Sequence, residues 1–463
     1  MSVVKKKLDI QSPFREEVRT INRVLREKGY QCYLVGGSVR DLLLGFNVYD
    51  FDFATDARPG EVSKLFRRVI PTGIKHGTVT VLMKNGTYEI TTYRSEGKYL
   101  DGRRPEEVHF SDTLEEDVLR RDFTINGLAY DISEEKIIDY VEGMKDLKDE
   151  LVRTIGDPVE RFSEDGLRTY RACRFAAKLK FRIDEYTMQA IPKTLHIAEK
   201  VSVERIRDEI MKMLEAEIPS IGLEYLRQSG LMEQCLPEVA ACYGVEQNKY
   251  HMFDVYYHSL YSCDSAPQDK PLLRLAALLH DIGKVPTRRM GDDGEYTFYN
   301  HEVVGARMTR KLMRRLKFSN EQVQTVTNLI SNHMFHYTPE WTDGAVRRFM
   351  RKAGLENLDQ LFELRMADRA GNGMREGLPE PIKKLQKRIE KIIEDENAFT
   401  VRDLDINGND LMKEFELKPG PVIGRVLNEL LEQVLDNPGL NRHDILVDMA
   451  RKVLEDMNHQ VKT

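Results

Sequence analysis

The sequence has few cysteines, and their spacing excludes two classes of protein. No two of the five follow a Cys-x-x-Cys pattern; they stand at Cys32, Cys173, Cys235, Cys242 and Cys263. This argues against a zinc site built from cysteines and against a disulfide framework. It suits a protein that works in a reducing compartment.

Long apolar runs, repeats and low-complexity tracts are also missing from the sequence. No segment approaches the ~18 apolar residues that a membrane-spanning helix needs. The basic start over residues 1–8 leads into no apolar stretch of the kind that a signal peptide contains. We therefore expect a cytoplasmic protein with no membrane partner.

Charged side chains are abundant instead. They make up 32% of the 463 residues, against 41% hydrophobic residues, and the net charge is -6. This composition fits a soluble, mostly helical protein, and a chain of this length should divide into roughly three or four domains. The net charge alone does not indicate a nucleic-acid partner, but basic residues are locally concentrated.

A glycine turn followed by two carboxylates is the most informative feature near the N-terminus. Residues 35–41 read Val-Gly-Gly-Ser-Val-Arg-Asp, and residues 50–52 read Asp-Phe-Asp. On a strand over 50–54, Asp50 and Asp52 would share one face while Phe51 and Phe53 enter the core. Two adjacent like charges predict a bound cation, and a glycine loop approaches phosphate easily. Together they predict a site for a metal-bound nucleoside triphosphate.

These strings, with Arg-Arg-Asp-Phe-Thr-Ile-Asn-Gly at 120–127, resemble the class II tRNA nucleotidyltransferase and bacterial poly(A) polymerase family, within the polymerase-beta type superfamily. The resemblance implies that Asp50 and Asp52 are catalytic and hold two Mg²⁺ ions. These ions would activate an RNA 3′-hydroxyl and neutralise the leaving pyrophosphate. It also implies nucleotide contacts from Gly37, Ser38, Arg40, Arg121, Asp122 and Asn126. Glu89 is either a third carboxylate of this site or a solvated strand residue.

A second motif, Glu-Asp-Gly-Leu-Arg over 164–168, predicts which nucleotides enter the site. On one helix, Asp165 and Arg168 would share a face. An acceptor beside a donor matches the amino group and ring nitrogen of cytosine and adenine, and mismatches uracil and guanine. The alternative is a surface ion pair, but the motif resembles the family's Glu-Asp-x-x-Arg element. The basic run that follows, including Arg171 and Arg174, either binds nucleotide or RNA phosphates or is a solvated helix face.

Three activities share such a head: full CCA addition, CC-only or A-only addition, and poly(A) synthesis. Residues 73–79 resemble the CCA-adding members, and residues 99–105 look like the flexible loop that CC-only enzymes lack. We therefore predict addition of C, C and A to tRNA 3′ ends from CTP and ATP. An A-only enzyme and a poly(A) polymerase remain the alternatives.

A second site is indicated by Leu-Leu-His-Asp-Ile-Gly-Lys at 278–284, which resembles the HD phosphohydrolase superfamily. The resemblance implies a second divalent metal held by His258, His280, Asp281 and Asp368, and a metal-activated water that attacks phosphate. His301, His333 and Lys284 stand where this superfamily places further ligands or phosphate contacts. Such domains in CCA enzymes are associated with 2′,3′-cyclic phosphodiesterase or phosphatase activity. The alternatives are an inactive HD scaffold, and a protein whose main task is HD phosphohydrolysis, with an RNA-binding head.

We predict an α+β fold, with a polymerase-beta-like head of mixed sheet and helices followed by an all-helical remainder. The expected domains are the head at 1–149, a neck and body at 150–249, an HD domain at 250–377 and a tRNA-binding tail at 378–463. Within the head, an Asn-Gly at 85–86 predicts a hairpin between strands at 78–83 and 87–93. A charged amphipathic helix is expected over 378–397, and a helix break is expected near Gly420.

Overall fold

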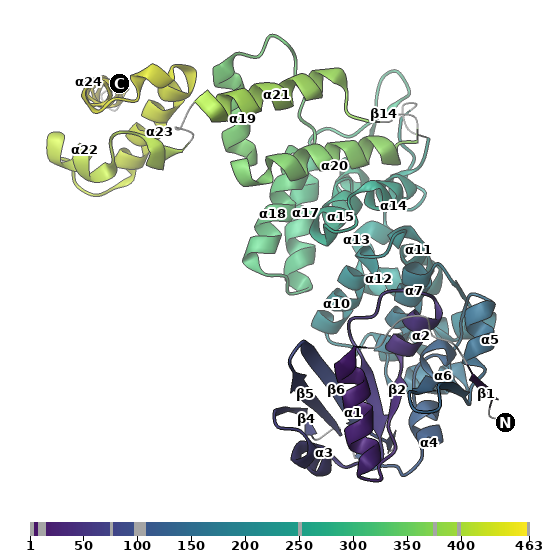
Figure 1. The fold of residues 1–463 in the computed structure, drawn as a ribbon. Helices are drawn as coiled ribbons and strands as arrows, with labels where there is room; N and C mark the ends of the chain where they lie inside the picture. Colours follow the sequence, from purple (N-terminus) through teal and green to yellow (C-terminus); the bar gives the residue numbers. More distant parts are fainter. Residues whose placement is uncertain are drawn as a thin grey trace. The chain divides into compact units, whose positions relative to one another are not determined.

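The structure is a computed structural model that describes residues 4–7, 15–74, 77–96, 108–248, 252–373, 377–395 and 400–460. The chain forms two compact units (Figure 1). The first comprises Met1–Ala240 and Arg315–Lys317, and the second comprises Ala241–Arg314 and Phe318–Thr463. The finer division into four domains stays a prediction. Among the described residues, no helix combines the length and the apolar character that crossing a bilayer requires.

A mixed eight-stranded sheet organises the N-terminal part of the first unit. Its order is β1-β10-β9-β2-β3-β6-β5-β4; β3 and β6 are parallel, and the other neighbours are antiparallel. The strands are β1 (Val4–Lys7), β2 (Tyr33–Val35), β3 (Asp52–Thr55), β4 (Val69–Gly73), β5 (Thr78–Met83), β6 (Gly86–Thr92), β9 (Leu128–Asp131) and β10 (Lys136–Asp139). The predicted α+β class with a polymerase-beta-like head is confirmed.

Short helices accompany the sheet. They are α1 (Glu16–Glu27), α2 (Gly37–Leu43), α3 (Pro59–Leu65), α4 (Leu114–Leu119), the 3₁₀ turn η2 (Thr124–Asn126) and α5 (Gly143–Lys148). In α1 the buried apolar residues Val18, Ile21 and Leu25 recur at helical spacing and form one face. A separate small sheet pairs β7 (Arg94–Glu96) with β8 (Val108–Phe110).

The strand predicted over 50–54 begins two residues late. Asp52 is the first residue of β3, and Asp50 lies outside regular structure. The physical reason is the neighbouring strand: β2 ends at Val35, which pairs with Asp52, and Gly36 then turns the chain at a φ of 72°. Residues before Asp52 therefore have no β2 backbone to pair with. Phe51 and Phe53 are buried as predicted.

The hairpin predicted between β5 and β6 is confirmed. Its two central residues are Lys84 and Asn85, because Met83 pairs with Gly86. Glycine therefore opens the second strand instead of occupying the turn.

The remainder of the first unit is mainly helical, with α7 buried at its centre and in contact with α10 and α11. The helices are α6 (Pro158–Glu164), α7 (Leu167–Leu179), α8 (Glu185–Ala190), η3 (Pro192–Thr194), α9 (Leu195–Ala198), α10 (Val203–Leu214), α11 (Pro219–Ser229), α12 (Leu231–Cys235) and α13 (Pro237–Ala240). A short parallel pair, β11 (Leu151–Val152) with β12 (Arg182–Ile183), interrupts them.

Asp165 and Arg168 do not lie on one helix, contrary to expectation. Helix α6 ends at Glu164, and Asp165 has an extended backbone (φ −145°, ψ 109°). Its carboxylate accepts a hydrogen bond from the backbone N–H of Leu167, 3.0 Å away, at the start of α7. Aspartate competes with helical hydrogen bonding in this way at helix starts, so the motif separates two helices.

The second unit is almost entirely helical. Its elements are α14 (Val255–Ser265), α15 (Pro271–Leu279), α16 (Lys284–Thr287), β13 (Arg289–Met290), β14 (Tyr296–Thr297), α17 (His301–Arg315), α18 (Asn320–Asn332), α19 (Asp343–Ala353), η4 (Leu355–Asn357), α20 (Leu358–Gly371), α21 (Glu380–Asp395), η5 (Val401–Asp403), α22 (Gly408–Glu414), α23 (Pro421–Asp436), η6 (Pro438–Leu440) and α24 (His443–Gln460). The helix expected over 378–397 is α21, and residues 396–399 lie outside the described part. The expected break precedes α23, where Gly420 is the N-cap.

Candidate active site and a second histidine cluster

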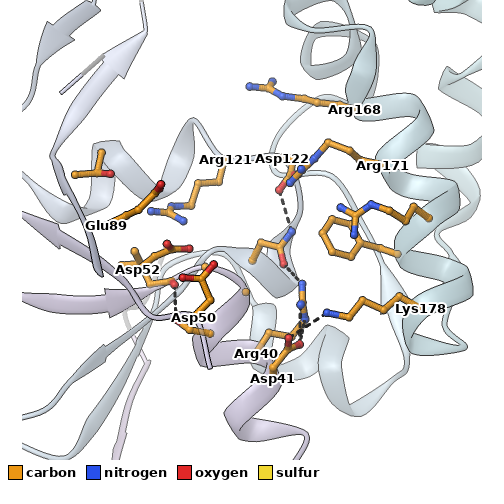
Figure 2. A pocket seen from close by; sticks show the side chains of 18 of the residues that line it. Arg40, Asp41, Asp50, Asp52, Glu89, Arg121, Asp122, Arg168, Arg171 and Lys178 are labelled. Atoms are coloured by element: carbon orange, nitrogen blue, oxygen red, sulfur yellow. Dashed lines mark hydrogen bonds and ion pairs between the residues drawn. The ribbon is translucent and has the colours of Figure 1, made fainter. Parts of the chain in front are cut away.

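A cavity of about 1030 Å³ in the first unit contains every residue that was predicted to bind or transfer a nucleotide. Its lining residues come from the loop before β3, from β6, from α2 and from α7, and Figure 2 shows the labelled side chains facing one another across it. The predicted set is Gly37, Ser38, Arg40, Asp50, Asp52, Arg121, Asp122, Asn126, Asp165, Arg168, Arg171 and Arg174. Their individual roles stay predictions.

Three carboxylates meet on one wall of the cavity. Asp52 at the start of β3 pairs in register with Glu89 of β6, and Asp50 joins them (Figure 2). Burial, reinforced by the charges of Asp50 and Glu89, raises the pKa of Asp52 to about 6, although Arg121 opposes the shift. An oxygen-only set of this kind fits Mg²⁺, which prefers carboxylate ligands.

The absence of a side chain at Gly36 leaves room for the guanidinium of Arg121. Gly36 has a positive φ of 72°, and a Cβ at this position would lie 3.0 Å from Nη1 of Arg121. Arg121 in turn donates from Nη2 to Asp117, 3.0 Å away. The Ser38 hydroxyl donates to the carbonyl of Val35 at 2.9 Å, which ties the start of α2 to the end of β2.

A buried polar network crosses the floor of the cavity. Arg40 donates from Nη1 to Asn126 at 2.5 Å and from Nε to Asp41 at 2.8 Å. The amide of Asn126 donates to Asp122 at 3.0 Å, which also accepts from Nε of Arg171 at 2.7 Å. Burial alone would raise the pKa of Asp122, but Arg171 and Asn126 outweigh it and hold that pKa well below its ordinary value.

The two base-selecting candidates each have a separate partner. Asp165 accepts from Nη2 of Arg205 at 2.7 Å and from Nη1 at 3.3 Å, while Arg168 donates to Glu164 and to the carbonyl of Arg161 at 3.0 Å. Asp165 therefore has Arg205 as a charged partner, and Arg168 has Glu164. Both side chains line the cavity.

Gly166 explains the tight packing at this point. A Cβ there would lie 2.7 Å from the carbonyl oxygen of Ile197 and 2.8 Å from the backbone nitrogen of Ala198. The backbone between Asp165 and α7 therefore packs directly against α9. This contact fixes the backbone from which the side chains of Asp165 and Arg168 extend.

Helix α10 supplies residues that the sequence analysis missed. Besides Arg205, Glu209 is buried and accepts from Nε of Arg174 at 2.5 Å. The sequence signal that could have identified Glu209 is helical periodicity. Glu209 stands in the same buried stripe as Ile206, Ile210 and Met213, and a carboxylate in such a stripe needs a buried partner.

A second cluster, the histidine cluster, lies in the second unit and brings together the four residues predicted as HD metal ligands. His258 Nε2 lies 3.1 Å from His280 Nε2 and 3.3 Å from Oδ1 of Asp368. Oδ2 of Asp281 lies 3.2 Å from His280 Nε2. His301 and His333, both buried, complete the cluster on the other side of Asp281.

Burial and the neighbouring carboxylates shift the pKa values of the histidine cluster in opposite directions. Burial disfavours the charged form of His258, but Asp281 and Asp368 outweigh it and raise the pKa of His258 to about 9. Burial, with the neighbouring His280, lowers the pKa of His333 to about 3. A neutral imidazole is the form that binds metals.

Two stretches that were used to distinguish family members fall partly or wholly outside the described residues. They are residues 75 and 76 within the run 73–79, and the loop at 99–105. The distinction that rests on them therefore stays a prediction.

A sheet of this order, carrying carboxylates beside a glycine turn, defines a nucleotidyltransferase with a polymerase-beta-like head, and family models agree. The model described as "Poly A polymerase head domain" matches residues 32–153. Those described as "Probable RNA and SrmB- binding site of polymerase A" and "tRNA nucleotidyltransferase domain 2 putative" match residues 180–243 and 300–450.

Full-length relatives narrow the class to one family. The CCA-adding enzymes of Ligilactobacillus salivarius and Enterococcus faecalis are each 33% identical to this chain, over 97% and 96% of it and 98% and 97% of their own lengths. The crystal structure of the Bacillus stearothermophilus CCA-adding enzyme in complex with CTP matches with a TM-score of 0.71 at 27% identity, covering 96% of this chain and all of that one. This chain belongs to the family of CCA-adding enzymes.

Proposed function

We propose that this protein adds C, C and A to the 3′ end of tRNA, using CTP and ATP. The observation that carries the proposal is a single cavity lined by the carboxylates of Asp50, Asp52 and Glu89 and by the side chains of Asp165 and Arg168. The 3′-oxygen of the RNA attacks the α-phosphorus, the bond from that phosphorus to the β-bridging oxygen breaks, and pyrophosphate leaves. The hydroxyl proton passes to solvent.

Asp50 and Asp52 would hold the divalent metal on which this family depends, with Mg²⁺ as the ion that the oxygen donors favour. When bound, Mg²⁺ lowers the pKa of the attacking hydroxyl and neutralises charge on the leaving pyrophosphate. Arg121 lies beside Asp52 and offers positive charge to the triphosphate. The polar network of Asn126 and Asp122 offers hydrogen bonds to the ribose, and its burial excludes water from that side.

Nucleotide choice rests on one carboxylate and one guanidinium. Asp165 would accept a hydrogen bond from the exocyclic amino group of cytosine or adenine, and Arg168 would donate to the ring nitrogen beside it. Uracil and guanine present a carbonyl and an N–H in these places, so each would leave both protein groups mismatched. A site that loses polar partners in this way discriminates strongly.

The reaction can be tested with tRNAs that end before CCA, after C and after CC, each incubated with labelled CTP or ATP. We expect CTP to label the first two and ATP to label the third. Labelling of only the CC-ended tRNA by ATP would instead identify an A-only enzyme, and repeated ATP addition a poly(A) polymerase. Asp50→Asn should abolish every addition, while Asp165→Ala should admit UTP and GTP.

The second candidate function is metal-dependent hydrolysis of a phosphate ester, favoured by the convergence of His258, His280, Asp281 and Asp368. Imidazole and carboxylate ligands suit a divalent transition metal, which would supply an activated water at neutral pH. A nucleoside 2′,3′-cyclic phosphate is the first substrate to assay. Hydrolysis that disappears in His280→Asn would support the assignment, and hydrolysis unaffected by that change would exclude it.

The cytoplasm is the compartment that we propose for both reactions. All five cysteines are buried free thiols, which fits a reducing environment.

A further inference from the structure

An exposed aromatic ring lies at the edge of the nucleotide cavity. Tyr49 stands directly before Asp50 in the loop between α2 and β3, is 71% exposed, and lines the cavity. A single exposed aromatic residue is ordinary on a protein surface. The position of this one, next to a carboxylate that we assign to the metal, is what calls for a functional explanation.

The ring of Tyr49 has a cation over it. Cζ of Arg15 lies 5.8 Å from the centroid of the ring, and Nη1 of Arg15 donates to the carbonyl oxygen of Asn85, in the turn between β5 and β6, at 3.4 Å. The quadrupole of an aromatic ring attracts a cation in this position. The contact therefore restrains the ring while most of it stays open to solvent, and a restrained group loses less entropy when it binds a ligand.

The incoming nucleotide leaves Tyr49 without a role. Its base is assigned to Asp165 and Arg168, which extend from the junction of α6 and α7. The other reactant is the RNA end, whose 3′-oxygen must reach the metal that Asp50 and Asp52 would hold. Only the ribose separates that oxygen from the terminal base. Since neighbouring Cα atoms are about 3.8 Å apart, the side chain of Tyr49 begins beside Asp50, within reach of this base.

We propose that Tyr49 stacks on the terminal base of the RNA acceptor and so places the attacking 3′-oxygen at the carboxylates. The inference rests on the proposed nucleotide addition and names a residue that binds its second substrate. Every base has a π-face, so stacking on an aromatic ring tolerates any sequence. That tolerance suits an acceptor whose terminal base changes as C, C and A are added.

Steady-state addition of C to a short RNA hairpin tests the inference. We expect Tyr49→Ala to raise the KM for the RNA about tenfold, as the loss of one base–aromatic stack suggests, and to leave the KM for CTP unchanged. Tyr49→Phe and Tyr49→Trp should keep the KM of the original protein. Phe46→Ala is the matched control, because Phe46 is 50% exposed in the same loop and does not line the cavity.

A hairpin that lacks only its terminal base separates stacking from a general effect on the loop. The contact is then missing whichever residue stands at position 49, so the original protein and Tyr49→Ala should have the same KM for this RNA. Binding can also be followed without catalysis, with 2-aminopurine as the terminal base. Stacking on Tyr49 should quench its fluorescence, and Tyr49→Ala should lose that quenching.

Each failure has a distinct meaning. An unchanged KM for the RNA in Tyr49→Ala would overturn the stacking role and keep the proposed nucleotide addition. An equal rise in KM for the complete and the base-free hairpin would show that Tyr49 only supports the loop, and would also overturn the stacking role. No addition of C by the unaltered protein would overturn the proposed function and this inference together.

Discussion

Asp52 carries an unfavourable charge in the metal-free protein. Burial, with the nearby charges of Asp50 and Glu89, raises its pKa from 3.8 to about 6. The folded state therefore binds a proton more tightly than the unfolded state. The free energy of unfolding must fall as the pH rises from about 4 to about 6, and the whole loss is present above pH 6.

Replacing Asp52 by asparagine should remove this pH dependence. In a chelating buffer we expect Asp52→Asn to stabilise the protein by about 3 kcal/mol at pH 7.5 and by almost nothing at pH 4, since each unit of pKa shift corresponds to about 1.4 kcal/mol. Urea denaturation at both pH values measures the difference. Asp112→Asn is the control, because its side chain is 92% exposed. An equal gain at both pH values would contradict the argument.

Arg205 contacts the carboxylate of Asp165, the group that we propose selects the base. It holds both oxygens of Asp165, which also accepts from the N–H of Leu167, and a carboxylate has about four lone-pair positions. One position remains for the amino group of the incoming base. We expect Arg205→Ala to lower the preference for CTP and ATP over UTP and GTP about tenfold, as the loss of a charged hydrogen bond suggests.

Single-nucleotide incorporation with each of the four triphosphates measures this preference. Arg207→Ala is a matched control on the same helix, because Arg207 pairs with Asp208 and does not line the cavity. A fall in kcat with unchanged selectivity would show that Arg205 only stabilises α10. Restored selectivity in Arg205→Lys would support the positioning role.

At the scale of elements, Gly283 sets the distance between the His280–Asp281 turn and α17. A Cβ at Gly283 would collide with the carbonyl of His301 and would lie 2.6 Å from the backbone nitrogen of Gly305. We expect Gly283→Ala to displace the first turn of α17, to destabilise the protein by about 1–3 kcal/mol, and to weaken binding of Mn²⁺ by the histidine cluster.

Gly424→Ala is the control for this substitution. It lies inside α23, where an added Cβ meets nothing within 4 Å, so alanine should stabilise the protein by about 0.5–1 kcal/mol. Denaturation and Mn²⁺ dialysis on both variants provide the test. Binding of Mn²⁺ that is unchanged in Gly283→Ala would show that this contact does not position His301.

The sequence predicts well those helices and strands whose positions depend on neighbouring residues in the chain. The hairpin of β5 and β6 and the helix α21 follow from turn residues and periodicity. The start of β3 at Asp52 and the break at Asp165 depend on distant partners, namely the end of β2 and the backbone of α9. The motifs identified the cavity residues, whereas the contacts of Arg205 and Glu209 required the packing of α10 on α7.

For the whole molecule, net charge is a poor guide to partners. The chain carries a net charge of -6, yet nine basic and six acidic side chains line the nucleotide cavity. Local concentration of positive charge around the carboxylates of Asp50, Asp52 and Glu89 suits an RNA end and a triphosphate.

The two sites should operate independently, because each is built from residues of one compact unit. The nucleotide cavity uses residues between Val35 and Arg205, and the histidine cluster uses residues between His258 and Asp368, on either side of the division at Ala240. We expect Asp52→Asn to reduce nucleotide addition at least 1000-fold, as removal of a metal ligand should, and to leave the metal content of the histidine cluster unchanged.

Asp281→Asn should have the converse effect. It removes the carboxylate that faces all four imidazoles of the histidine cluster. We therefore expect the cluster to lose metal binding and any phosphohydrolase activity, while the rate of C addition to a short RNA hairpin stays within about twofold. Metal analysis and single-turnover addition on the same preparations measure both properties. A parallel fall in nucleotide addition, absent from His336→Asn at an exposed histidine close in sequence, would reveal coupling between the units and would contradict their independence.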